Sequence, residues 1–453
     1  MSLRLRQNSS FQVEAVSQEE SLECAMILKS YEGVTARFLR RNERLIHSLE
    51  TEMPLVFEAK ERKDVKFLQE FLKVNSESLM EDVAKYGALL FRGFEIHSDR
   101  DFENAILSIE GLQGISEAFM AEQGRERVGD LKYVLHTNTI FKTGGTLYLG
   151  GFHSENYYNP DVPGFISFCC LKPSDVGGET GLINMEKVYE HLDEELKKKL
   201  EDKACLVEKW LLRDVADRYK ISIEMLEGIC HQFDLPIVGE GENRLILMHK
   251  PNVFLHPVTQ KKALQINFFS LPTLNKVLRK DFLKDYQGKT WFWHRFVWKL
   301  PHSIFKAIEN VFVFFATLLH SPKEQLKIAA SKKKTQKAFE KLGQKFPKVS
   351  SCFSEKDIEH LSGLMRNFYC SSLWKKGDIL LVDNKKVAHA GMPGTGPRLV
   401  RALISNPLEM GYSPTQSGCF ICQDRMTSSI GAHIATACAS ERTSKLSSLC
   451  DIN

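Results

Sequence analysis

Short apolar runs, bounded by glycine, proline or asparagine, recur through the middle of this chain. The clearest is GALLFRGF at residues 87–94, which has a glycine near each end. Such a run is typical of a buried strand. Comparable runs predict further strands at residues 147–153, 164–171, 181–184, 244–248, 263–269, 379–382 and 398–405. Short strands separated by turn residues favour an antiparallel barrel or jelly roll.

A helical pattern interrupts these strands. Residues 185–203 and 215–231 have the apolar spacing of helices, and residues 25–31 and 36–49 show helical stretches ahead of the first strand. The mixture predicts an α+β protein in which helices flank and interrupt a strand-rich core.

Charge is distributed unevenly along the 453 residues. The proportions of apolar (43%) and charged (26%) residues are those of a globular protein and exclude a disordered or fibrous chain. Residues 276–348, however, contain 17 Lys or Arg against 5 Asp or Glu, a local charge of +12. Because the net charge of the whole chain is only +4, the remaining residues sum to −8.

These shifts in composition predict four parts. Residues 1–49 form a helical lead-in, and residues 50–278 and 349–408 form the strand-rich domain. Residues 279–348 form a basic, aromatic-rich helical insertion. Residues 409–453, rich in Ser, Thr, Ala and Cys, form a weakly structured extension.

The insertion also contains Trp291, Trp293, Trp298 and the apolar run 311–319. That run is too short to span a bilayer, which needs roughly 20 apolar residues, so it predicts an interfacial or a buried helix. Basic residues interleaved with aromatics suit an anionic membrane surface. A helical cap over the barrel mouth with solvated lysines is the second interpretation, and a nucleic-acid or protein partner is the third. The lysines of residues 332–348 fit a solvated helix face better than a phosphate-binding surface, so nucleic acid is not favoured.

The 11 cysteines are an odd number, and the chain opens with MSLRLR rather than an apolar signal segment. We therefore expect reduced thiols in a cytoplasmic protein, for which peripheral attachment to a membrane stays open. Cys419 and Cys422 form a CxxC. No second pair stands at zinc-site spacing, so ordinary free thiols are expected there.

His153 and Glu155 place an imidazole and a carboxylate two residues apart at the end of a predicted strand. The period of two points both side chains to one face and Ser154 to the other. With a third ligand from a distant strand, they would form a set of two histidines and one carboxylate. Such a set leaves one side of an Fe(II) ion open to a co-substrate and O₂. By itself, His-x-Glu equally describes a surface histidine beside a solvated glutamate.

The second half of the predicted site lies far downstream, in GDILLVDNKKVAHA at residues 377–390. A Gly-Asp turn leads into an apolar strand, an Asp-Asn turn ends it, and His389 follows on the next segment. Gly-Pro-Arg at 396–398 then opens another strand, which can bring the guanidinium of Arg398 beside His389. A buried arginine suits a planar carboxylate, which it holds through two parallel hydrogen bonds. A surface arginine at a strand start is the plain alternative.

Four segments of the chain together resemble the taurine dioxygenase and clavaminate-synthase-like superfamily of Fe(II)/2-oxoglutarate oxygenases. They are GALLFRGF at 87–94, FCCLKPSDVGGETGLINMEKVYEHLD at 168–193 with its Gly-Gly-Glu-Thr box, His-Pro-x-Thr at 256–259, and GDILLVDN…AHAGMPGTGPR at 377–398. The resemblance covers residues 50–278 and 350–408 and implies a double-stranded β-helix, or jelly-roll, core. The short loop from His389 to Arg398 is most similar to the branch found in peptide-natural-product pathways.

The resemblance implies a role for five residues. His153, Glu155 and His389 would ligate iron, while Thr180 and Arg398 would hold the distal carboxylate of 2-oxoglutarate. The implied cofactor is Fe(II), with 2-oxoglutarate and O₂ as co-substrates.

Arg401 is a rival to Arg398, because many members of the family carry two arginines in this segment. Residues 398 and 401 have opposite parity on a strand, so only one should face the barrel interior. The Gly-Pro-Arg motif favours Arg398. Asn267 is a candidate substrate contact, or else a structural asparagine.

Two positions bear on which reaction the resemblance implies. Related oxygenases of this branch usually carry an arginine two residues after the distal histidine, whereas this chain has Gly391. A substrate anion that this arginine binds in those oxygenases need not be a substrate of this chain. Halogenating relatives replace the carboxylate ligand by a small residue, and Glu155 argues against that outcome.

The sequence thus predicts a dioxygenase that hydroxylates or desaturates an unactivated C–H bond of a small, amino-acid-derived substrate, releasing succinate and CO₂. A different class of function is a non-catalytic barrel that serves as a membrane-binding or partner-binding module through its basic insertion. The intact set of five co-substrate and metal residues favours the enzyme.

Overall fold

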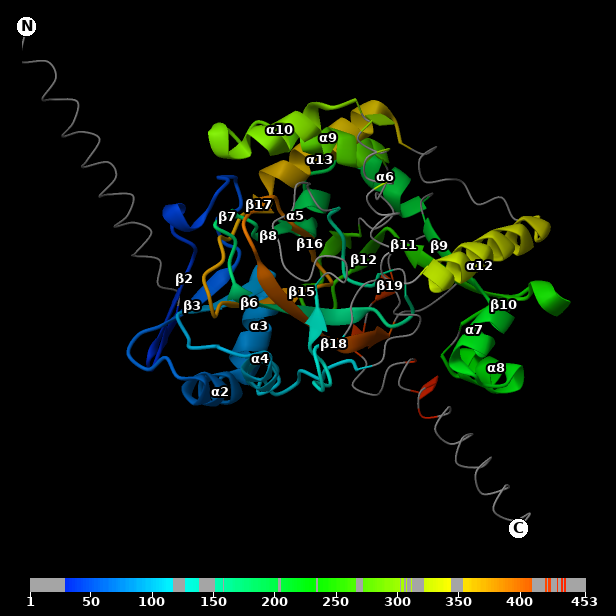
Figure 1. The fold of residues 1–453 in the computed structure, drawn as a ribbon, viewed down its shortest axis with the longest axis horizontal. Helices are drawn as coiled ribbons and strands as arrows, with labels where there is room; N and C mark the ends of the chain where they lie inside the picture. Colours follow the sequence, from blue (N-terminus) through cyan, green and yellow to red (C-terminus); the bar gives the residue numbers. More distant parts are fainter. Residues whose placement is uncertain are drawn as a thin grey trace, which may run out of the picture.

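The computed structural model describes residues 29–116, 127–137, 151–157, 159–202, 205–233, 235–265, 272–301, 322–343 and 353–409. It also describes positions 303, 304, 307 and 311 and short pieces between 420 and 436. Figure 1 shows strands at the centre of the molecule with helices around them.

A nine-stranded sheet forms the centre of the fold, in the order β1-β2-β3-β4-β15-β6-β18-β20, with β5 also paired to β18. All of its neighbours are antiparallel except β3 and β4. Its strands are β1 (Lys29–Tyr31), β2 (Val34–Arg37), β3 (Leu55–Ala59), β4 (Ala88–Arg92), β5 (Leu135–His136), β6 (Pro163–Lys172), β15 (Ile379–Asp383), β18 (Leu399–Glu409) and β20 (Gln423–Asp424).

A smaller sheet of three strands lies against one face of the large sheet. Its order is β14 (Tyr369–Cys370), β8 (Thr180–Asn184) and β16 (Val387–Gly391). An isolated antiparallel bridge joins His153 to His389 at the free edge of β16. One further pair of short strands, β7 (Val176–Gly177) with β17 (Gly394–Thr395), forms an antiparallel two-stranded sheet.

The two sheets enclose an apolar layer because side chains alternate along each strand. Leu90, Phe168 and Val382 of the large sheet meet Leu182 and Val387 of the small sheet in one buried cluster. We call this the inner layer. The central strands are buried on both faces, which explains why their sequences are continuous apolar runs.

Helices cover the two outer faces. Helices α2 (Val65–Val74), α3 (Ser76–Tyr86) and α4 (Asp99–Ile106) pack against the large sheet. Helices α5 (Met185–Glu190), α6 (Glu194–Asp202), α9 (Pro272–Phe282), α10 (Phe292–Lys299) and α13 (Glu355–Asn367) pack behind the small sheet. In Figure 1, α9, α10 and α13 lie together at the top of the molecule.

A peripheral unit lies at the side of these layers. Its sheet has the order β10 (Ile237–Val238), β11 (Leu245–Pro251) and β9 (Cys205–Leu211). Helices α7 (Leu212–Tyr219) and α8 (Ile223–Gln232) form a buried cluster with it. Ala338 of the lysine-rich helix α12 (Pro322–Lys341) packs on Leu211 and Leu245. A third small sheet has the order β13 (Lys262–Leu264), β12 (Val253–Leu255) and β19 (Phe420–Ile421).

Most of the predicted strands are present where they can be compared. The runs at 87–94, 164–171, 181–184, 244–248, 379–382 and 398–405 correspond to β4, β6, β8, β11, β15 and β18, so an α+β fold is confirmed. The run at 263–269 is a strand only over β13, and residues 266–269 lie outside the described residues. Residues 147–150 also lie outside them.

The helical predictions at the N-terminus were wrong for residues 36–49 and for residues 29–31, the described part of 25–31. Residues 29–37 form the hairpin β1-β2, which joins the edge of the large sheet through β3, and only a short 3-10 turn, η1 (Arg41–Glu43), follows. Gly33 has a φ of +74° at the hairpin turn, and Val34 and Ala36 alternate into the core. Pairing with an existing sheet edge buried these side chains better than a short helix could, which overrode the local pattern.

The two long predicted helices are each divided. Residues 185–203 contain α5 and α6, separated at residues 191–193, and residues 215–231 fall in α7 and α8. Lys220 has a φ of +56°, a left-handed conformation that ends α7. Apolar periodicity does not mark such a break, because the helical spacing resumes after it.

Other features concern the ends of the chain and the cysteines. Within residues 409–453, β19 and β20 pair with β12 and β18, and Ile430 and Ile434 are buried. Cys169, Cys170, Cys230 and Cys370 are free and buried, whereas Cys419 and Cys422 lie outside the described residues. Within the described part of the chain, no helix has both the length and the apolar composition required to cross a bilayer.

A buried ion-pair network ties η1 to the large sheet. Arg92, on β4, donates to Asp378 through Nε (3.1 Å) and Nη2 (2.7 Å) and to Glu43 through Nη1 (2.8 Å). Arg37, on β2, donates to the same Glu43 at 2.7 and 3.0 Å. Burial alone would raise the pKa of Glu43, but the hydrogen bonds and charges of the two arginines hold it well below its ordinary value.

The substitution Glu43→Gln should destabilise the fold by about 3–5 kcal/mol at neutral pH, because it leaves two buried guanidinium groups short of a counter-charge. Since the folded-state pKa lies below the unfolded value, the stabilisation is present above about pH 4.5 and is lost as the pH falls further. Urea unfolding of both proteins at several pH values would measure this, and the difference between them should shrink in acid.

Asp130→Asn is the matched control, because Asp130 is exposed and pairs with an exposed Arg100 at 3.2 Å. It should change stability little at any pH. Equal losses in the two variants would contradict a special role for the buried network.

Candidate metal centre

His153 and His389 are brought together by backbone pairing. Each residue's N–H donates to the other's carbonyl, at 3.1 Å and 2.9 Å. Directly opposed residues of an antiparallel pair carry their side chains on the same face, so the two imidazoles lie side by side. Their ring centroids are 4.5 Å apart.

Glu155 is positioned by the side chain of Asn384, which follows β15. Oδ1 of Asn384 accepts from the backbone N–H of Glu155 at 2.6 Å, and Nδ2 donates to the carbonyls of Glu155 (3.1 Å) and Pro163 (2.7 Å). The next residue, Asn156, has a φ of +50°, so the chain turns immediately after the carboxylate. Asn384 therefore fixes the short segment that carries Glu155 against the end of a central strand.

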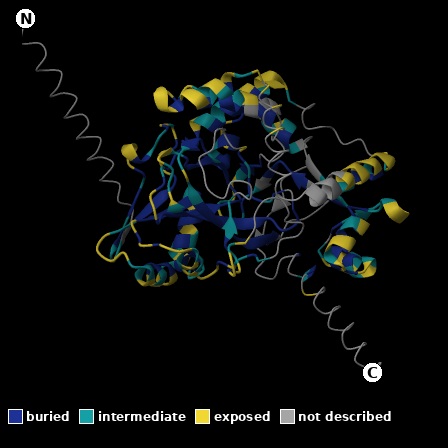
Figure 2. Ribbon diagram, in the orientation of Figure 1, coloured by how far each residue is buried: buried dark blue, intermediate teal, exposed yellow. Residues whose placement is uncertain are grey.

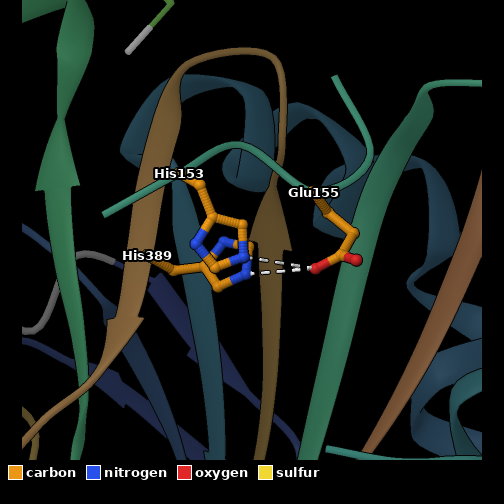
Figure 3. A group of neighbouring side chains, drawn as sticks. All are labelled: His153, Glu155 and His389. Atoms are coloured by element: carbon orange, nitrogen blue, oxygen red, sulfur yellow. Dashed lines mark ion pairs between the residues drawn. The ribbon is translucent and has the colours of Figure 1, made fainter. Parts of the chain in front are cut away.

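The three side chains converge on one point (Figure 3). One ligand atom from each of His153, Glu155 and His389 can be chosen so that all lie within 4.8 Å of one another. Oε2 of Glu155 is 3.7 Å from Nε2 of His153 and 3.4 Å from Nε2 of His389. Ligand atoms that share a metal ion at bond lengths near 2.1 Å are ~3 Å apart when adjacent, so the observed spacing is close to that of a metal site.

The hydrogen bonding of His153 suits metal ligation. Its Nδ1 lies 2.8 Å from the carbonyl oxygen of Gly151, so the proton belongs on Nδ1 and the Nε2 lone pair faces Glu155. The side chain of His153 is 40% exposed, whereas those of Glu155 and His389 are nearly buried at 7% and 3%. The cluster is thus open on the side of His153 and enclosed on the side of the sheets.

Thr180 lies on the same face of the small sheet as His389. In the register of β8 and β16, His389 is opposite Leu182 and Gly391 is opposite Thr180, so these side chains point into the inner layer. The ring of Phe168 contacts that of His389 from the large sheet, with centroids 5.3 Å apart. Thr180 is 5% exposed.

The two arginines point to different places. Arg401 donates from Nε to Asp99 at 2.6 Å, on the helix-covered outer face of the large sheet, and Nη1 lies 3.0 Å from Nδ1 of His136. Arg398 instead donates to the carbonyl of Gly178 at 2.6 Å, and Nη2 lies 3.6 Å from the point where Gly391 would carry a Cβ. The opposite orientation predicted for these two residues is therefore present.

Two consecutive glycines shape this end of the site. Gly177 and Gly178 have φ values of +64° and +70°, which side chains other than glycine rarely adopt. A Cβ on Gly178 would lie 2.2 Å from Oγ of Ser174. The turn presents the Gly178 carbonyl to Arg398 and starts β8 at Thr180, which explains the Gly-Gly-Glu-Thr motif in physical terms.

A comparison with known families assigns the chain to one of them. Residues 50–403 match the model of the taurine catabolism dioxygenase TauD, TfdA family. The chain belongs to this family. The TauD/TfdA oxygenase described here is therefore a dioxygenase that uses Fe(II), 2-oxoglutarate and O₂, as the sequence predicted.

Individual relatives are distant. The chain is 23% identical over 330 residues to the dapdiamide synthesis protein DdaC of Enterobacter agglomerans, a match that covers 72% of this chain and 84% of the relative. Among solved structures, a taurine dioxygenase from Burkholderia xenovorans is 11% identical with a TM-score of 0.41, covering 89% of this chain and 99% of that one. PvcB, an Fe, alpha-ketoglutarate dependent oxygenase from an isonitrile synthetic pathway, is 12% identical with a TM-score of 0.42, covering 83% and 93%.

A fully buried carboxyl group stands behind the arginine of this oxygenase. Glu179 accepts from Tyr369 Oη at 3.1 Å and from Ser371 Oγ at 3.0 Å. Burial raises the pKa of Glu179, and its hydrogen bonds and Arg398 oppose that shift only in part. Burial likewise lowers the pKa of Arg398, against the influence of Cys170 and Glu179. The guanidinium of Arg398 therefore lies in a half-buried place, where a charge-assisted pair with a carboxylate is favoured.

A second polar network supports the segment between β15 and β16. Asp383 is fully buried, 2.9 Å from Nε2 of His256 and 3.1 Å from Nζ of Lys385. Nδ1 of His256 accepts from the backbone N–H groups of Val258 and Thr259, so Nε2 carries the proton donated to Asp383. Burial alone would raise the pKa of Asp383, but the charges of Lys385 and His256 outweigh burial and hold this pKa well below its ordinary value.

Sequence reasoning selected five candidate residues, His153, Glu155, Thr180, His389 and Arg398, but not the side chains that position them. Asn384 was recognised only as part of a turn, and His256 only as part of a motif. A polar pair directly after an apolar strand was the available signal, because buried polar side chains require partners. Asn267 lies outside the described residues.

Asn384→Ala should weaken Fe(II) binding by roughly 10- to 100-fold, because residues that orient metal ligands contribute about that much to metal affinity. Anaerobic Fe(II) titration of the purified protein would measure it.

Asn406→Ala is a matched control. Asn406 is also a buried asparagine that clamps backbone, accepting from Gln113 N–H (2.8 Å) and donating to the Gly111 carbonyl (2.7 Å). Both variants should lose stability on urea unfolding. Similar Fe(II) affinities in the two would show that Asn384 does not orient the ligand.

Proposed function

We propose that His153, Glu155 and His389 hold the Fe(II) ion of this oxygenase. The observation that carries the proposal is the convergence of the three ligand atoms within 4.8 Å at the edge of the inner layer. Two imidazoles and one carboxylate suit Fe(II) and occupy one face of it, leaving the other for co-substrate and O₂. The non-catalytic alternative is not favoured, because the chain retains all five residues together.

The core in this proposal is a jelly roll, or double-stranded β-helix. The large sheet and the small sheet would be its two halves, with the iron ligands at the edge between them. Antiparallel pairing throughout the centre, apart from β3 with β4, and the inner layer between the sheets support it.

When bound, Fe(II) together with 2-oxoglutarate and O₂ supplies the oxidant that hydroxylates or desaturates an unactivated C–H bond, with release of succinate and CO₂. The chain's own residues bind and orient the reactants. Arg398 would pair with the distal carboxylate of 2-oxoglutarate, and Thr180 would donate a hydrogen bond to it. Both lie beside Gly391, two residues after His389, so they would hold 2-oxoglutarate near the proposed metal ligands. The inner layer, with Phe168 and Leu182, excludes water on the buried side.

The proposed substrate is small and derived from an amino acid. The distant similarity to a dapdiamide synthesis protein and the short His389-to-Arg398 loop support this class. Gly391 is opposite Thr180, and a side chain at this position would point into the inner layer beside Arg398. A long side chain there would crowd the guanidinium. A substrate anion would therefore have to be bound by a residue other than 391.

The proposed organisation and partners follow the distribution of charge. The oxygenase domain would comprise residues 50–278 and 349–408, with residues 1–49 as its lead-in, 279–348 as an insertion and 409–453 as an extension. The enzyme would act in the cytoplasm, and the insertion would meet an anionic membrane surface. Nucleic acid is not a proposed partner. The lysines of α12 at positions 332–334 are exposed, and the other side of this helix packs on β9 and β11. This arrangement is that of an ordinary solvated helix face.

His153→Ala, Glu155→Ala and His389→Ala should each abolish succinate production and weaken Fe(II) binding, because two ligands hold the ion too weakly. Iron-dependent turnover of 2-oxoglutarate by the purified protein would measure this. His191→Ala, which changes an exposed histidine outside the cluster, should leave turnover unchanged. Full activity in any two of the three ligand variants would remove the assignment.

Arg398→Gln should raise the 2-oxoglutarate KM strongly, since a carboxylate would lose a charge-assisted partner that contributes roughly 2–5 kcal/mol. Arg401→Gln is the control: it breaks the pair with Asp99 and should lower stability without changing that KM. Steady-state kinetics at varied 2-oxoglutarate would compare them. A larger KM effect for Arg401→Gln would exchange the roles of the two arginines.

A further inference from the structure

Helix α10 exposes large aromatic side chains on its outer face. Phe292, Trp293 and Phe296 are 60%, 66% and 53% exposed. They contact one another edge to face, with ring centroids 5.4 Å apart for Phe292–Trp293 and 6.2 Å for Trp293–Phe296. We call these three residues the aromatic face. Figure 2 shows α10 as an exposed helix at the top of the molecule.

The inner side of the same helix is also aromatic. His294 and Trp298 are buried, and Tyr286 contacts Trp298 and Trp291 with centroids 5.3 and 4.7 Å apart. A helix at the surface of a globular protein normally carries charged or polar residues on its outer face. The buried side chains of His294 and Trp298 already hold α10 against the protein, so the aromatic face is not needed for this purpose.

Apolar exposure continues beyond α10. Ile304 and Val311 are 48% and 54% exposed, and Ala307 is exposed as well. These positions belong to the segment that follows α10, which ends at Lys299, and they add exposed apolar side chains to the same part of the chain. The ring contacts make the aromatic face itself contiguous, and contiguous exposed apolar surface marks a contact site for a protein or a membrane.

The charge around the aromatic face is positive. Residues 286–308 include no Asp or Glu but include Lys289, Arg295, Lys299 and Lys306. Lys289, in the turn before α10, and Lys299, the last residue of α10, are both exposed. The nearest acidic residues on the preceding segment, Asp281 and Asp285, are paired with Lys284 and Arg366.

This combination favours an anionic bilayer over a second copy of the chain. A two-fold contact through the aromatic face would bring Lys289 and Lys299 of both copies together without an acidic partner from residues 286–308. Lipid phosphates supply the missing negative charge, and aromatic rings flanked by lysines are what interfacial helices insert among lipid headgroups.

We propose that α10 docks this oxygenase on anionic phospholipid bilayers, with the aromatic face among the headgroups and Lys289 and Lys299 against the phosphates. This locates the membrane partner named with the proposed function, and it stands apart from the chemistry of the iron site. The docked helix is coupled to the site through its neighbour: Cη2 of Trp291 would lie 2.6 Å from a Cβ on Gly177, in the turn that leads to Thr180.

The test uses the full-length protein and sedimentation with two kinds of vesicle, phosphatidylcholine alone and phosphatidylcholine with phosphatidylserine, at low and high salt. The wild type should sediment with the anionic vesicles at low salt and be released by high salt. The triple variant Phe292→Ser, Trp293→Ser, Phe296→Ser should stay in the supernatant. Lys289→Gln with Lys299→Gln should weaken binding about 30-fold.

Leu49→Ser, Val74→Ser and Val258→Ser together form the matched control, because these residues are 69%, 82% and 63% exposed and belong to segments other than α10. This variant should bind like the wild type. Recovery of the wild type in the supernatant with both vesicles, or equal loss in the control, overturns the proposal.

Two further measurements separate the alternatives. Light scattering without lipid should show the same mass for the wild type and the aromatic-face variant; a larger wild-type mass that falls in the variant would assign the face to a second copy and overturn the proposal. Iron-dependent turnover of 2-oxoglutarate should be equal in both proteins without vesicles. Membrane binding without any turnover would contradict the proposed function and leave the docking surface intact.

Discussion

The reciprocal backbone pairing of His153 with His389 is the contact on which the arrangement of this site depends. Two hydrogen bonds hold the segment before Asn156 against the free edge of β16. Pairing in this register puts both imidazoles on the inner face, and the period of two brings Glu155 to the same point. A shift of one residue would turn His389 toward the helices behind the small sheet, where Ala388 and Ala390 now pack.

That pairing is supported by polar side chains at both ends of β15, the strand between β4 and β6. Asp378, just before the strand, is bound by Arg92, and Asp383, at its last residue, is bound by His256 and Lys385. Asn384 then joins this strand end to Glu155. A buried carboxylate without a partner would raise the free energy of the folded state, so the partners of Asp378 and Asp383 restrict β15 to one position. The site is therefore built on the most enclosed part of the sheet, although His153 itself reaches solvent.

The two faces of the small sheet carry different kinds of residue. Its inner face carries His389 and Thr180, while its outer face is covered by α5, α9, α10 and α13. Trp291 and Tyr286 of the insertion pack close to the Gly177–Gly178 turn, so residues far from the oxygenase motifs in sequence complete the wall behind the site. Glu179 lies between these layers, bonded to Tyr369 and Ser371. A change on the outer helices thus has a direct packing route to the turn that positions Arg398.

The amino-acid sequence alone determined the central strands, the α+β class, the oxygenase family and the five candidate residues. Central strands buried on both faces leave continuous apolar runs, and motifs at His153, the Gly-Gly-Glu-Thr box and His389 keep their order whatever surrounds them. Even the opposite orientation of Arg398 and Arg401 followed from strand parity. The N-terminal hairpin, the breaks in the two long helices and the partners of Glu155 were decided only by tertiary structure. Ala36 and Val34 lie in a strand because a sheet edge was present to pair with, and Asn384 reaches Glu155 across 229 positions of sequence. Such contacts depend on which surfaces meet after folding, and local periodicity carries no record of them.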